Sequence, residues 1–265
     1  MSKINLQGKR ALVTGGSQGI GAGICIELAA CGADVCVNYF KNSQKAEKLV
    51  AHIQKKYGVK AFCVKANVAQ SDQIRDMFLQ IDREFGGLDI LVNNAGIEST
   101  KHFLELDENE WDLIHDVNLK GPFICSREAG KRMEKSGGGA IINISSIHDQ
   151  VPRKGLAHYC SAKAGLKMLS KSMALELAES NIRVNTVSPG AIYTEMNRDE
   201  IEKFGVEKFN KWIPQGRIGE IGEVAPSIAF LASDLSSYIT GTELYIDGAY
   251  LLSMVQYDPR PPRKN

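Results

Sequence analysis

The sequence has 265 residues, of which 43% are hydrophobic and 24% are charged, a composition typical of one globular domain with a sizeable core. Its 32 basic and 31 acidic residues leave a formal net charge of +1, which creates no field to attract nucleic acid or an anionic membrane. We therefore expect neither as a partner. No signal peptide precedes the first strand and no apolar run is long enough to span a bilayer, so we expect a cytoplasmic protein.

The six cysteines are scattered among apolar and helical segments. None belongs to a C-x-x-C pair, and none has the spacing of metal ligands. The sequence therefore predicts free thiols in a reducing compartment and no metal site.

Predicted strands and helices alternate along most of the chain. Strands are expected at residues 10–14, 33–39, 60–65, 88–93, 140–145, 182–188 and 243–246. Helices are expected at 19–31, 42–57, 71–85 (with Ser71 as N-cap), 108–135 and 158–178, and two more helical stretches precede the last strand. This alternation predicts an α/β fold: a single-domain, doubly wound, Rossmann-type parallel sheet with helices on both faces. The domain is expected to span 1–255. The Pro-rich basic tail at 256–265 is either a frayed terminus or an arm that bridges subunits.

A glycine-rich turn joins the first predicted strand to the first predicted helix. It runs from Thr14 to Gly21 and reads TGGSQGIG. Its glycines allow the backbone to turn sharply and to approach a ligand closely. The helix that follows presents free N–H groups and its positive dipole end to a pyrophosphate. This context favours a dinucleotide-binding turn, although the spacing differs from G-x-G-x-x-G and an ordinary turn is the alternative.

The tip of the second predicted strand carries no carboxylate to select the ribose of NAD. It reads Asn38-Tyr39-Phe40-Lys41-Asn42. A 2′-phosphate is therefore not repelled, and Lys41 can pair with it. The sequence predicts NADP or NAD as cofactor, with a slight preference for NADP. An exposed lysine at the start of a helix is an equally good interpretation of Lys41.

Three polar side chains near the fifth strand and the following helix point to proton transfer. Ser146 follows the strand, and Tyr159 and Lys163 are four residues apart, which places them on one face of a helix. A phenol has a reference pKa near ~10, and a nearby ammonium favours the phenolate. Ser146 would hold the reacting oxygen while Tyr159 moves the proton. Each residue alone is weak evidence, so the order of the motifs carries the prediction.

Together these motifs resemble the classical short-chain dehydrogenase/reductases. The resemblance runs from Gln7 to about Gly248 and rests on the glycine-rich turn, Asn93-Asn94-Ala95-Gly96, Asn118, Ser146, Tyr159 with Lys163, and Ser188-Pro189-Gly190 with Thr194. It implies an NAD(P)-dependent enzyme that interconverts a secondary alcohol and a ketone, or a sugar hemiacetal and a lactone. Tyr159 would be the general acid/base, Ser146 would orient the substrate oxygen, and Lys163 would hold the nicotinamide ribose and tune Tyr159. Asn118 would support a proton relay through water.

The resemblance also implies which residues contact the cofactor. On the adenosine and pyrophosphate side these would be Gly15, Ser17, Gln18, Gly19, Ile20, Gly21, Tyr39, Lys41, Asn67 and Val68. On the nicotinamide side they would be Asn94, Ala95, Gly96, Tyr159, Lys163, Pro189, Gly190, Ile192 and Thr194. Family members usually carry Asp at the position of Asn67, but an Asn oxygen still accepts a hydrogen bond from the adenine amino group.

Within the family, the sequence most resembles the bacterial glucose dehydrogenases. Glu98, His148 and Asp149 would bind the hydroxyl groups of a polyol beside Ser146 and Tyr159, although Glu98 and His148 are alternatively solvated loop residues. The loop at 153–155 and Phe40 depart from that type. Hydroxysteroids, small diols or acyl-carrier ketones are therefore alternative substrates, and a catalytically silent dinucleotide-binding protein is the alternative function.

Two further expectations concern a covering segment and assembly. The segment 193–214 is expected to close over the substrate, or to form ordinary amphipathic-helix core, with Met196, Phe204, Phe209 and Trp212. By likeness to relatives we expect a homotetramer whose contacts use the helices at 108–135 and 158–178.

Overall fold

The computed structural model describes residues 4–195 and 198–253. Predictions for Met196 and for the tail at 256–265 lie outside these residues. In the described part, seven parallel strands form one sheet in the order β3-β2-β1-β4-β5-β6-β7. The strands are β1 (Arg10–Val13), β2 (Asp34–Tyr39), β3 (Ala61–Lys65), β4 (Ile90–Asn93), β5 (Gly139–Ile144), β6 (Ile182–Pro189) and β7 (Glu243–Ile246). The predicted fold class is confirmed.

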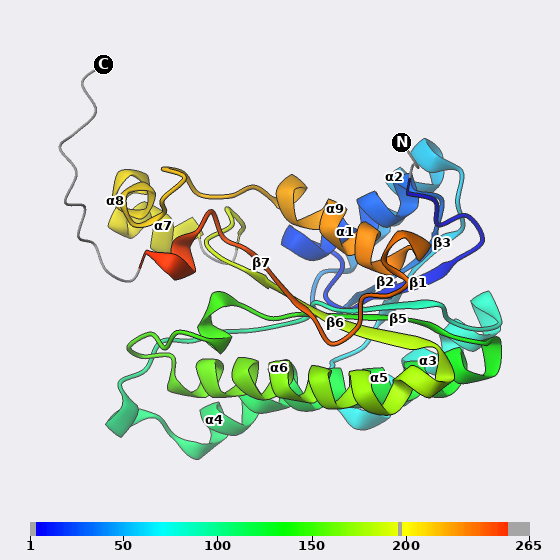
Figure 1. The fold of residues 1–265 in the computed structure, drawn as a ribbon, viewed down its shortest axis with the longest axis horizontal. Helices are drawn as coiled ribbons and strands as arrows, with labels where there is room; N and C mark the ends of the chain where they lie inside the picture. Colours follow the sequence, from blue (N-terminus) through cyan, green and yellow to red (C-terminus); the bar gives the residue numbers. More distant parts are fainter. Residues whose placement is uncertain (1–3, 196–197, 254–265) are drawn as a thin grey trace.

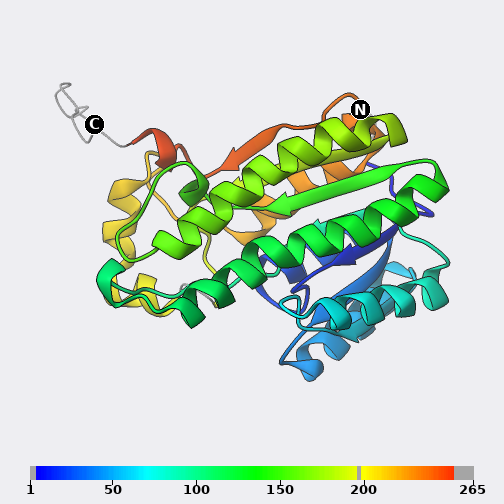
Figure 2. The same cartoon turned by 90° about the horizontal axis from the view of Figure 1, so that it is seen from below.

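Helices cover both faces of the sheet (Figures 1 and 2). One face carries α1 (Gly19–Ala30), α2 (Ser43–Tyr57) and α9 (Ile221–Ala232), and the other carries α3 (Ser71–Phe85), α5 (Gly121–Ser136) and α6 (Ala157–Leu177). Neighbouring strand residues serve opposite layers because side chains alternate across a sheet. Val13 packs in the layer under α1 and α9, whereas Leu12 packs in the layer under α3 and α5. Both are fully buried.

The long helix predicted at 108–135 is wrong in one respect. The structure has α4 (Glu108–His115), then a π-helical turn (Asp116–Lys120), then α5. A π turn adds a residue to a helix without breaking its hydrogen-bonded path. Sequence periodicity cannot reveal such an insertion, because polar and apolar residues continue on both sides of it.

Two smaller expectations are also corrected. Ser71 is the first residue of α3 rather than its N-cap; Gln70 occupies the cap without a side-chain bond. Before β7 the described chain has α7 (Arg198–Phe204), α8 (Val206–Trp212) and α9 rather than two helical stretches. Gly205 separates α7 from α8 with a φ of 83°, a conformation that favours glycine.

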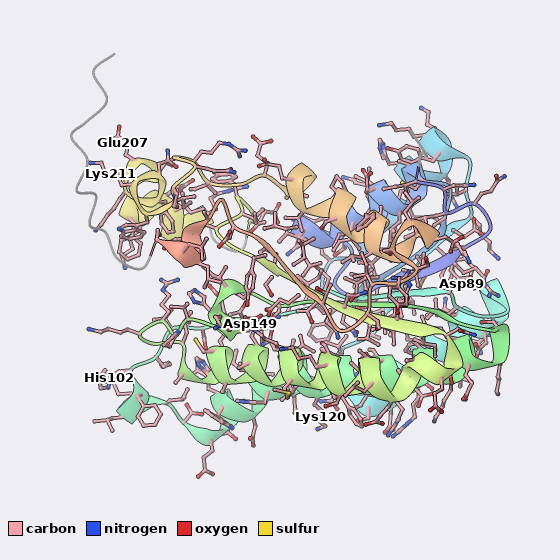
Figure 3. All side chains as sticks on the ribbon, in the orientation of Figure 1. Asp89, His102, Lys120, Asp149, Glu207 and Lys211 are labelled. Atoms are coloured by element: carbon pink, nitrogen blue, oxygen red, sulfur yellow. The ribbon has the colours of Figure 1, made fainter. Side chains whose placement is uncertain are left out.

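The strand order reverses between β1 and β4, and ligands of open α/β sheets bind beyond the carboxyl ends of strands at such a point. Figure 3 shows Asp89, just before β4, at the opposite end of the molecule from Glu207 and Lys211 on α8. At that opposite end Asp89 accepts two hydrogen bonds from the Arg10 guanidinium, at 2.7 and 3.0 Å. A ligand is therefore expected at the end of the molecule that carries α7 and α8.

Candidate active site

The glycine-rich turn is held by hydrogen bonds from two neighbouring strands. The Asn38 side-chain oxygen accepts a bond from the Gly15 N–H at 3.1 Å, and the Thr14 hydroxyl accepts from the N–H groups of Asn94 and Ala95 at 3.0 Å each. A Cβ on Gly21 would lie 2.4 Å from the Gly15 carbonyl oxygen, and one on Gly15, whose φ is 60°, would lie 2.9 Å from the Ala95 Cα. Only glycine permits this tight approach.

The start of α1 fits a bound pyrophosphate. Gln18 is the N-cap residue, its side chain makes no capping bond, and the first turn contains no acidic residue. The first N–H groups of the helix therefore lack a side-chain acceptor, and the positive end of the dipole faces the turn. Ser17, Gly19 and Ile20 are partly exposed here. These residues remain the predicted contacts of the dinucleotide phosphates.

Ser146, Tyr159 and Lys163 come together at the carboxyl end of β5. The Ser146 hydroxyl lies close enough to the Tyr159 phenol to act on its pKa. The Lys163 ammonium lies 5.6 Å from the centroid of the Tyr159 ring and donates a 2.9 Å hydrogen bond to the Ile144 carbonyl. The helical spacing thus brings the phenol and the ammonium to one face of α6, close to the serine.

Burial changes the proton affinities of this pair. It raises the pKa of the Tyr159 phenol, the opposite of the shift expected from the sequence, while the hydrogen bond from Ser146 acts in the other direction. Burial lowers the pKa of Lys163 to about 8. The tyrosine therefore holds its proton at neutral pH, and the lysine becomes the group that titrates nearest the physiological range.

The π turn presents Asn118 to the same place. Its amide nitrogen donates to the carbonyls of Ile97 and Ile114 at 2.8 and 2.9 Å, whereas its buried oxygen Oδ1 has no hydrogen-bond partner. A Cβ on Gly96 would lie 2.9 Å from this oxygen and 3.7 Å from the Lys163 Nζ. A buried, unsatisfied acceptor beside an ammonium is the environment of a bound water.

The comparisons with known proteins agree with this geometry. The sequence profile of the family described as Enoyl-(Acyl carrier protein) reductase matches residues 15–250. A 3-oxoacyl-[acyl-carrier-protein] reductase from Staphylococcus aureus is 43% identical over 240 residues, which cover 91% of this chain and 97% of that protein. A short-chain type dehydrogenase/reductase from Picea abies is 38% identical over 250 residues, 92% of each chain. The chain is a short-chain dehydrogenase/reductase.

Solved structures place the fold in the same family. A short-chain type dehydrogenase/reductase from Mycobacterium marinum superposes with a TM-score of 0.88 at 38% identity, over 93% of this chain and 97% of that one. A gluconate 5-dehydrogenase from Burkholderia cenocepacia, solved with NADP and tartrate, gives 0.89 at 33% identity, over 95% and 98%. This short-chain dehydrogenase/reductase is thus an oxidoreductase that acts on CH–OH or ketone groups, in a family that uses NAD(P).

On the adenosine side of this short-chain dehydrogenase/reductase, the predicted contacts have mixed surroundings. Tyr39 is partly exposed, Lys41 is exposed and Val68 is buried. The Asn67 oxygen already accepts a 3.0 Å hydrogen bond from the Ala69 N–H, so only its second lone pair remains for an adenine amino group. The Asn94 amide is similarly engaged: it donates to two carbonyls of the glycine-rich turn at 2.9 and 3.1 Å.

Sequence reasoning missed Lys45. Its ammonium lies 3.3 Å from the Gln18 side-chain oxygen and 2.6 Å from Glu195, so it joins α2 to the glycine-rich turn and to the segment after β6. The signal was present: Asn42 caps α2 by accepting a bond from the Lys45 N–H, which places Lys45 in the first turn, beside the strand tip.

On the nicotinamide side, the chain after β6 folds back over the glycine-rich turn. A Cβ on Gly19 would lie 3.9 Å from the Thr194 side chain. Pro189 ends β6, and a Cβ on Gly190 would lie 2.7 Å from the Asp247 Cβ, so this turn packs tightly against the chain that follows β7. Ile192 is buried. The chain after β6 thus packs against both the glycine-rich turn and the chain that follows β7.

The substrate side of the short-chain dehydrogenase/reductase contains His148 and Glu98. The His148 Nδ1 lies 3.0 Å from the Val151 carbonyl, so it carries the proton and leaves the Nε2 lone pair as an acceptor. Burial lowers the pKa of His148, which favours this neutral form. Glu98 is exposed, and the residue after it, Ser99, hydrogen-bonds to His158 at 2.9 Å.

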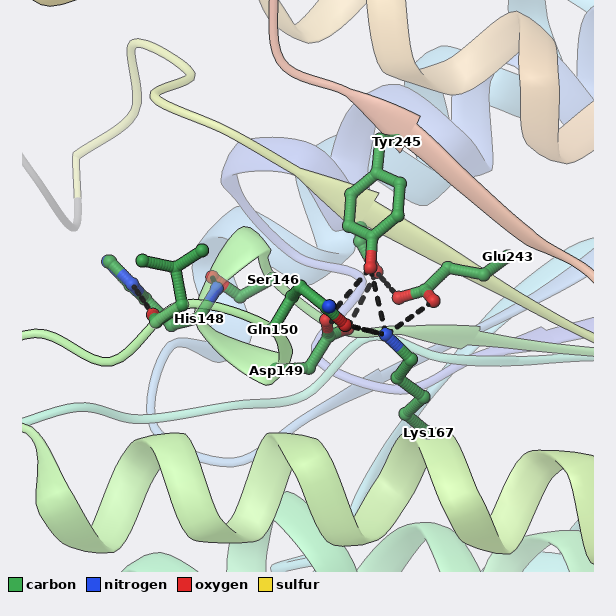
Figure 4. Close-up of polar contacts among 9 residues, drawn as sticks. Ser146, His148, Asp149, Gln150, Lys167, Glu243 and Tyr245 are labelled. Carbon is green, nitrogen blue, oxygen red and sulfur yellow. Dashed lines mark hydrogen bonds and ion pairs between the residues drawn. The ribbon is translucent and has the colours of Figure 1, made fainter. Parts of the chain in front are cut away.

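Asp149 does not belong to the substrate surface, which corrects the prediction that it binds a polyol. Its side chain is completely buried and accepts hydrogen bonds from Ser188 at 2.8 Å and from Tyr245 at 3.3 Å. Figure 4 shows the His148 ring directed away from this cluster. Asp149 pairs inward because buried carboxylates require partners, whereas the histidine next to it is free to face the other way.

Two further observations concern metal sites and membrane spans. Among the described residues, no group of three His, Cys, Asp or Glu side chains could hold a metal ion. No helix in the same part of the chain is long and apolar enough to cross a membrane. Phe209 on α8 is buried, and its ring contacts Trp212 edge-on at 5.3 Å, so these two aromatics pack with each other in core-like fashion.

Proposed function

We propose that this enzyme interconverts a secondary alcohol and a ketone, or a sugar hemiacetal and a lactone as glucose dehydrogenases do, on a small polyhydroxylated substrate with NADP as the preferred cofactor. The juxtaposition of Ser146, Tyr159 and Lys163 carries the proposed chemistry. A neutral His148 with a free acceptor nitrogen, two residues after Ser146, supports a substrate with several hydroxyl groups.

In the proposed mechanism, Ser146 binds the reacting oxygen and Tyr159 moves the proton. The glycine-rich turn would hold the dinucleotide, which would supply the hydride chemistry when bound. In ketone reduction, the protonated phenol donates its proton to the oxygen that Ser146 holds. A water bound between the Lys163 ammonium and the Asn118 oxygen would return a proton from solvent. The raised pKa of Tyr159 keeps the proton-donating form populated at neutral pH.

The preference for NADP is supported by the cations near the tip of β2. No carboxylate stands there to repel a 2′-phosphate, and Lys41 is exposed. Lys45 lies against Gln18 and so offers a second positive charge within reach of the turn. Because Lys45 also pairs with Glu195, a phosphate would compete with that carboxylate.

A second candidate activity is reduction of a 3-oxoacyl thioester. The observation that favours it is the 43% identity to a 3-oxoacyl-[acyl-carrier-protein] reductase over nearly its whole length. The proton chemistry at Tyr159 would be the same. The difference lies in the groups that meet the rest of the substrate, a long acyl arm instead of several hydroxyls.

A substrate panel tests both candidates. We would follow the absorbance of the reduced nicotinamide with sugars, sugar acids, small diols, a hydroxysteroid and a 3-oxoacyl thioester, each with NADPH/NADP⁺ and NADH/NAD⁺. Turnover should be lost by ~10²- to 10⁴-fold in Tyr159→Phe. Tyr238→Phe is the matched control because Tyr238 is fully exposed. A protein that binds dinucleotide but turns over no member of the panel would instead be a silent binding protein.

We also propose that the enzyme assembles as a homotetramer. Large apolar side chains are exposed on the helices expected to form contacts: Trp111, Leu113 and Phe123 on α4 and α5, and Met168 and Leu175 on α6. Exposed apolar groups on neighbouring helices are typical of subunit interfaces. Light scattering measures the mass directly, and a monomer at micromolar concentration would contradict the proposal.

A further inference from the structure

A buried charge cluster lies behind the catalytic serine, and no step of the proposed mechanism uses it (Figure 4). Its members come from four different elements. They are Asp149 in the short turn after Ser146, Lys167 on α6, Ser188 near the end of β6, and Glu243 and Tyr245 on β7.

Lys167 is the centre of this cluster. Its ammonium lies 2.7 Å from a Glu243 oxygen and 3.4 Å from an Asp149 oxygen. It also contacts the Tyr245 hydroxyl at 2.9 Å and the Gln150 side-chain oxygen at 2.8 Å. One side chain on α6 is therefore bonded both to the turn after β5 and to β7.

The carboxylates are also joined to each other through a hydroxyl. Ser188 Oγ lies 2.8 Å from Asp149 and 3.0 Å from Glu243. Burial raises the pKa of Asp149, whereas hydrogen bonds from its neighbours lower the pKa of Glu243. The pair therefore keeps one proton more readily than two separate carboxylates would, which limits the charge that the interior has to hold.

Two members of the cluster, Lys167 and Asp149, stand close in sequence to proposed active-site residues. Lys167 follows Lys163 by one helical turn and Tyr159 by two. Asp149 ends the turn that Ser146 begins, and the Ser146 Oγ accepts a hydrogen bond from the His148 N–H at 3.2 Å within that turn. A displacement of the cluster would thus be transmitted to the serine and to the helix of the tyrosine.

We propose that Lys167, Asp149 and Glu243 form a positioning network that fixes the turn bearing Ser146 against the helix bearing Tyr159 and Lys163. The network touches neither substrate nor cofactor. It acts by holding the serine hydroxyl in place beside the phenol, and a misplacement of about 1 Å at such a site can cost ~10²-fold in rate. This inference rests on the proposed roles of Ser146, Tyr159 and Lys163.

The main test replaces Lys167 by methionine in the full chain. We expect kcat for Lys167→Met to fall ~10- to 100-fold while KM for the dinucleotide stays near the wild-type value, because the glycine-rich turn is remote from the change. Lys171→Met is the matched control: it removes an exposed lysine one turn further along the same helix. Glu243→Gln keeps the hydrogen-bonding shape and should lose less activity than Lys167→Met.

A double variant separates positioning from general destabilisation. In Lys167→Met the two carboxylates face each other without a cation, and adding Glu243→Gln removes that repulsion, so kcat of the double variant should exceed that of Lys167→Met. If the two changes lower kcat independently of each other, the proposed network is contradicted. If Lys167→Met does not fold, the kinetics of Glu243→Gln and of the double variant decide the question by the same comparison with wild type.

A crystal structure gives a readout that needs no substrate. The proposal predicts that the Ser146 Oγ moves relative to the Tyr159 hydroxyl in Lys167→Met and keeps its wild-type position in Lys171→Met. An unchanged Ser146 position in Lys167→Met together with wild-type kcat overturns it. If the wild-type enzyme turns over none of the panel, the proposed function fails, and the network is then judged on the crystal structures alone.

Discussion

The cofactor turn and the catalytic edge of this enzyme are built in different ways. In the turn between β1 and α1, backbone atoms make the close contacts. Glycines bring carbonyl and N–H groups together, and few side chains could be added without a clash. The catalytic edge between β5, α6 and β7 depends on side chains, including a lysine, two carboxylates and two tyrosines that are bonded across several elements. Added atoms are therefore expected to disturb the glycine-rich turn, whereas the loss of a charged side chain is expected to disturb the catalytic edge.

This difference predicts which changes each region resists. In the turn, adding one methyl group should impair cofactor binding while the chemistry of bound substrate continues. At the catalytic edge, an isosteric change should stop the chemistry while cofactor binding continues. Three variants and a pH profile can test this difference between the two regions.

After Tyr159→Phe, the largest effect is expected for Ser146→Ala. Removing the hydroxyl that holds the reacting oxygen should lower kcat by ~10²- to 10³-fold, as for other groups that bind developing oxygen charge. Dinucleotide affinity should stay unchanged in a fluorescence titration. Ser172→Ala, an exposed position on the same helix as Tyr159, serves as control. An equal loss of kcat and of dinucleotide affinity in Ser146→Ala would show that the catalytic edge and the cofactor turn are not separate in this way.

The next effect is expected for Gly21→Ala. The new Cβ would lie 2.4 Å from the Gly15 carbonyl oxygen, so the turn has to shift. Overpacking of this kind costs ~1–3 kcal/mol, which corresponds to a loss of ~5- to 150-fold in cofactor affinity. Gly222→Ala is the matched control, because that glycine lies near the start of α9 with open space around it. Wild-type cofactor affinity in Gly21→Ala would show that the turn can shift to accommodate the methyl group without harming the cofactor site.

A pH profile examines the catalytic edge without mutation. The pKa of Lys163 is lowered to about 8, so its ammonium is present at lower pH and lost as the pH rises through that value. Because the pKa of Tyr159 is raised, the phenol stays protonated over the same range. Ketone reduction at subsaturating substrate should therefore decline above pH about 8, by up to ~tenfold per pH unit. Lys163→Arg should move the decline to higher pH; an unchanged profile would exclude the lysine.

The smallest effect is expected for Lys45→Gln. The side chain is partly exposed and shares its charge with Glu195, and exposed ion pairs contribute at most ~1 kcal/mol. KM for NADPH should rise by less than ~fivefold, while KM for NADH stays the same. Lys48→Gln on the exposed face of α2 is the control. A larger rise for NADH than for NADPH would contradict the proposed phosphate contact.

The sequence was sufficient to predict the fold class and to propose the main site residues. Alternating strands and helices, the glycine-rich turn and the i, i+4 spacing of Tyr159 and Lys163 are local patterns, so they could be found without coordinates. The buried partners of Asp149 could not, because Lys167 and Glu243 are 18 and 94 residues away from it in the sequence and meet it only when α6 and β7 pack on the turn after β5. The rise in the pKa of Tyr159 was missed for a related reason: burial depends on the whole fold.

The π turn at Asp116–Lys120 has a consequence for how this enzyme can change. One surplus residue rotates everything after it by about 100° relative to an uninterrupted helix. Deleting a single residue there would restore regular winding but swing the apolar stripe of α5 off the sheet, and no point substitution could swing it back. Insertions and deletions are therefore expected to be tolerated in the loops, but a change of even one residue in length is not expected to be tolerated in the π turn around Asn118.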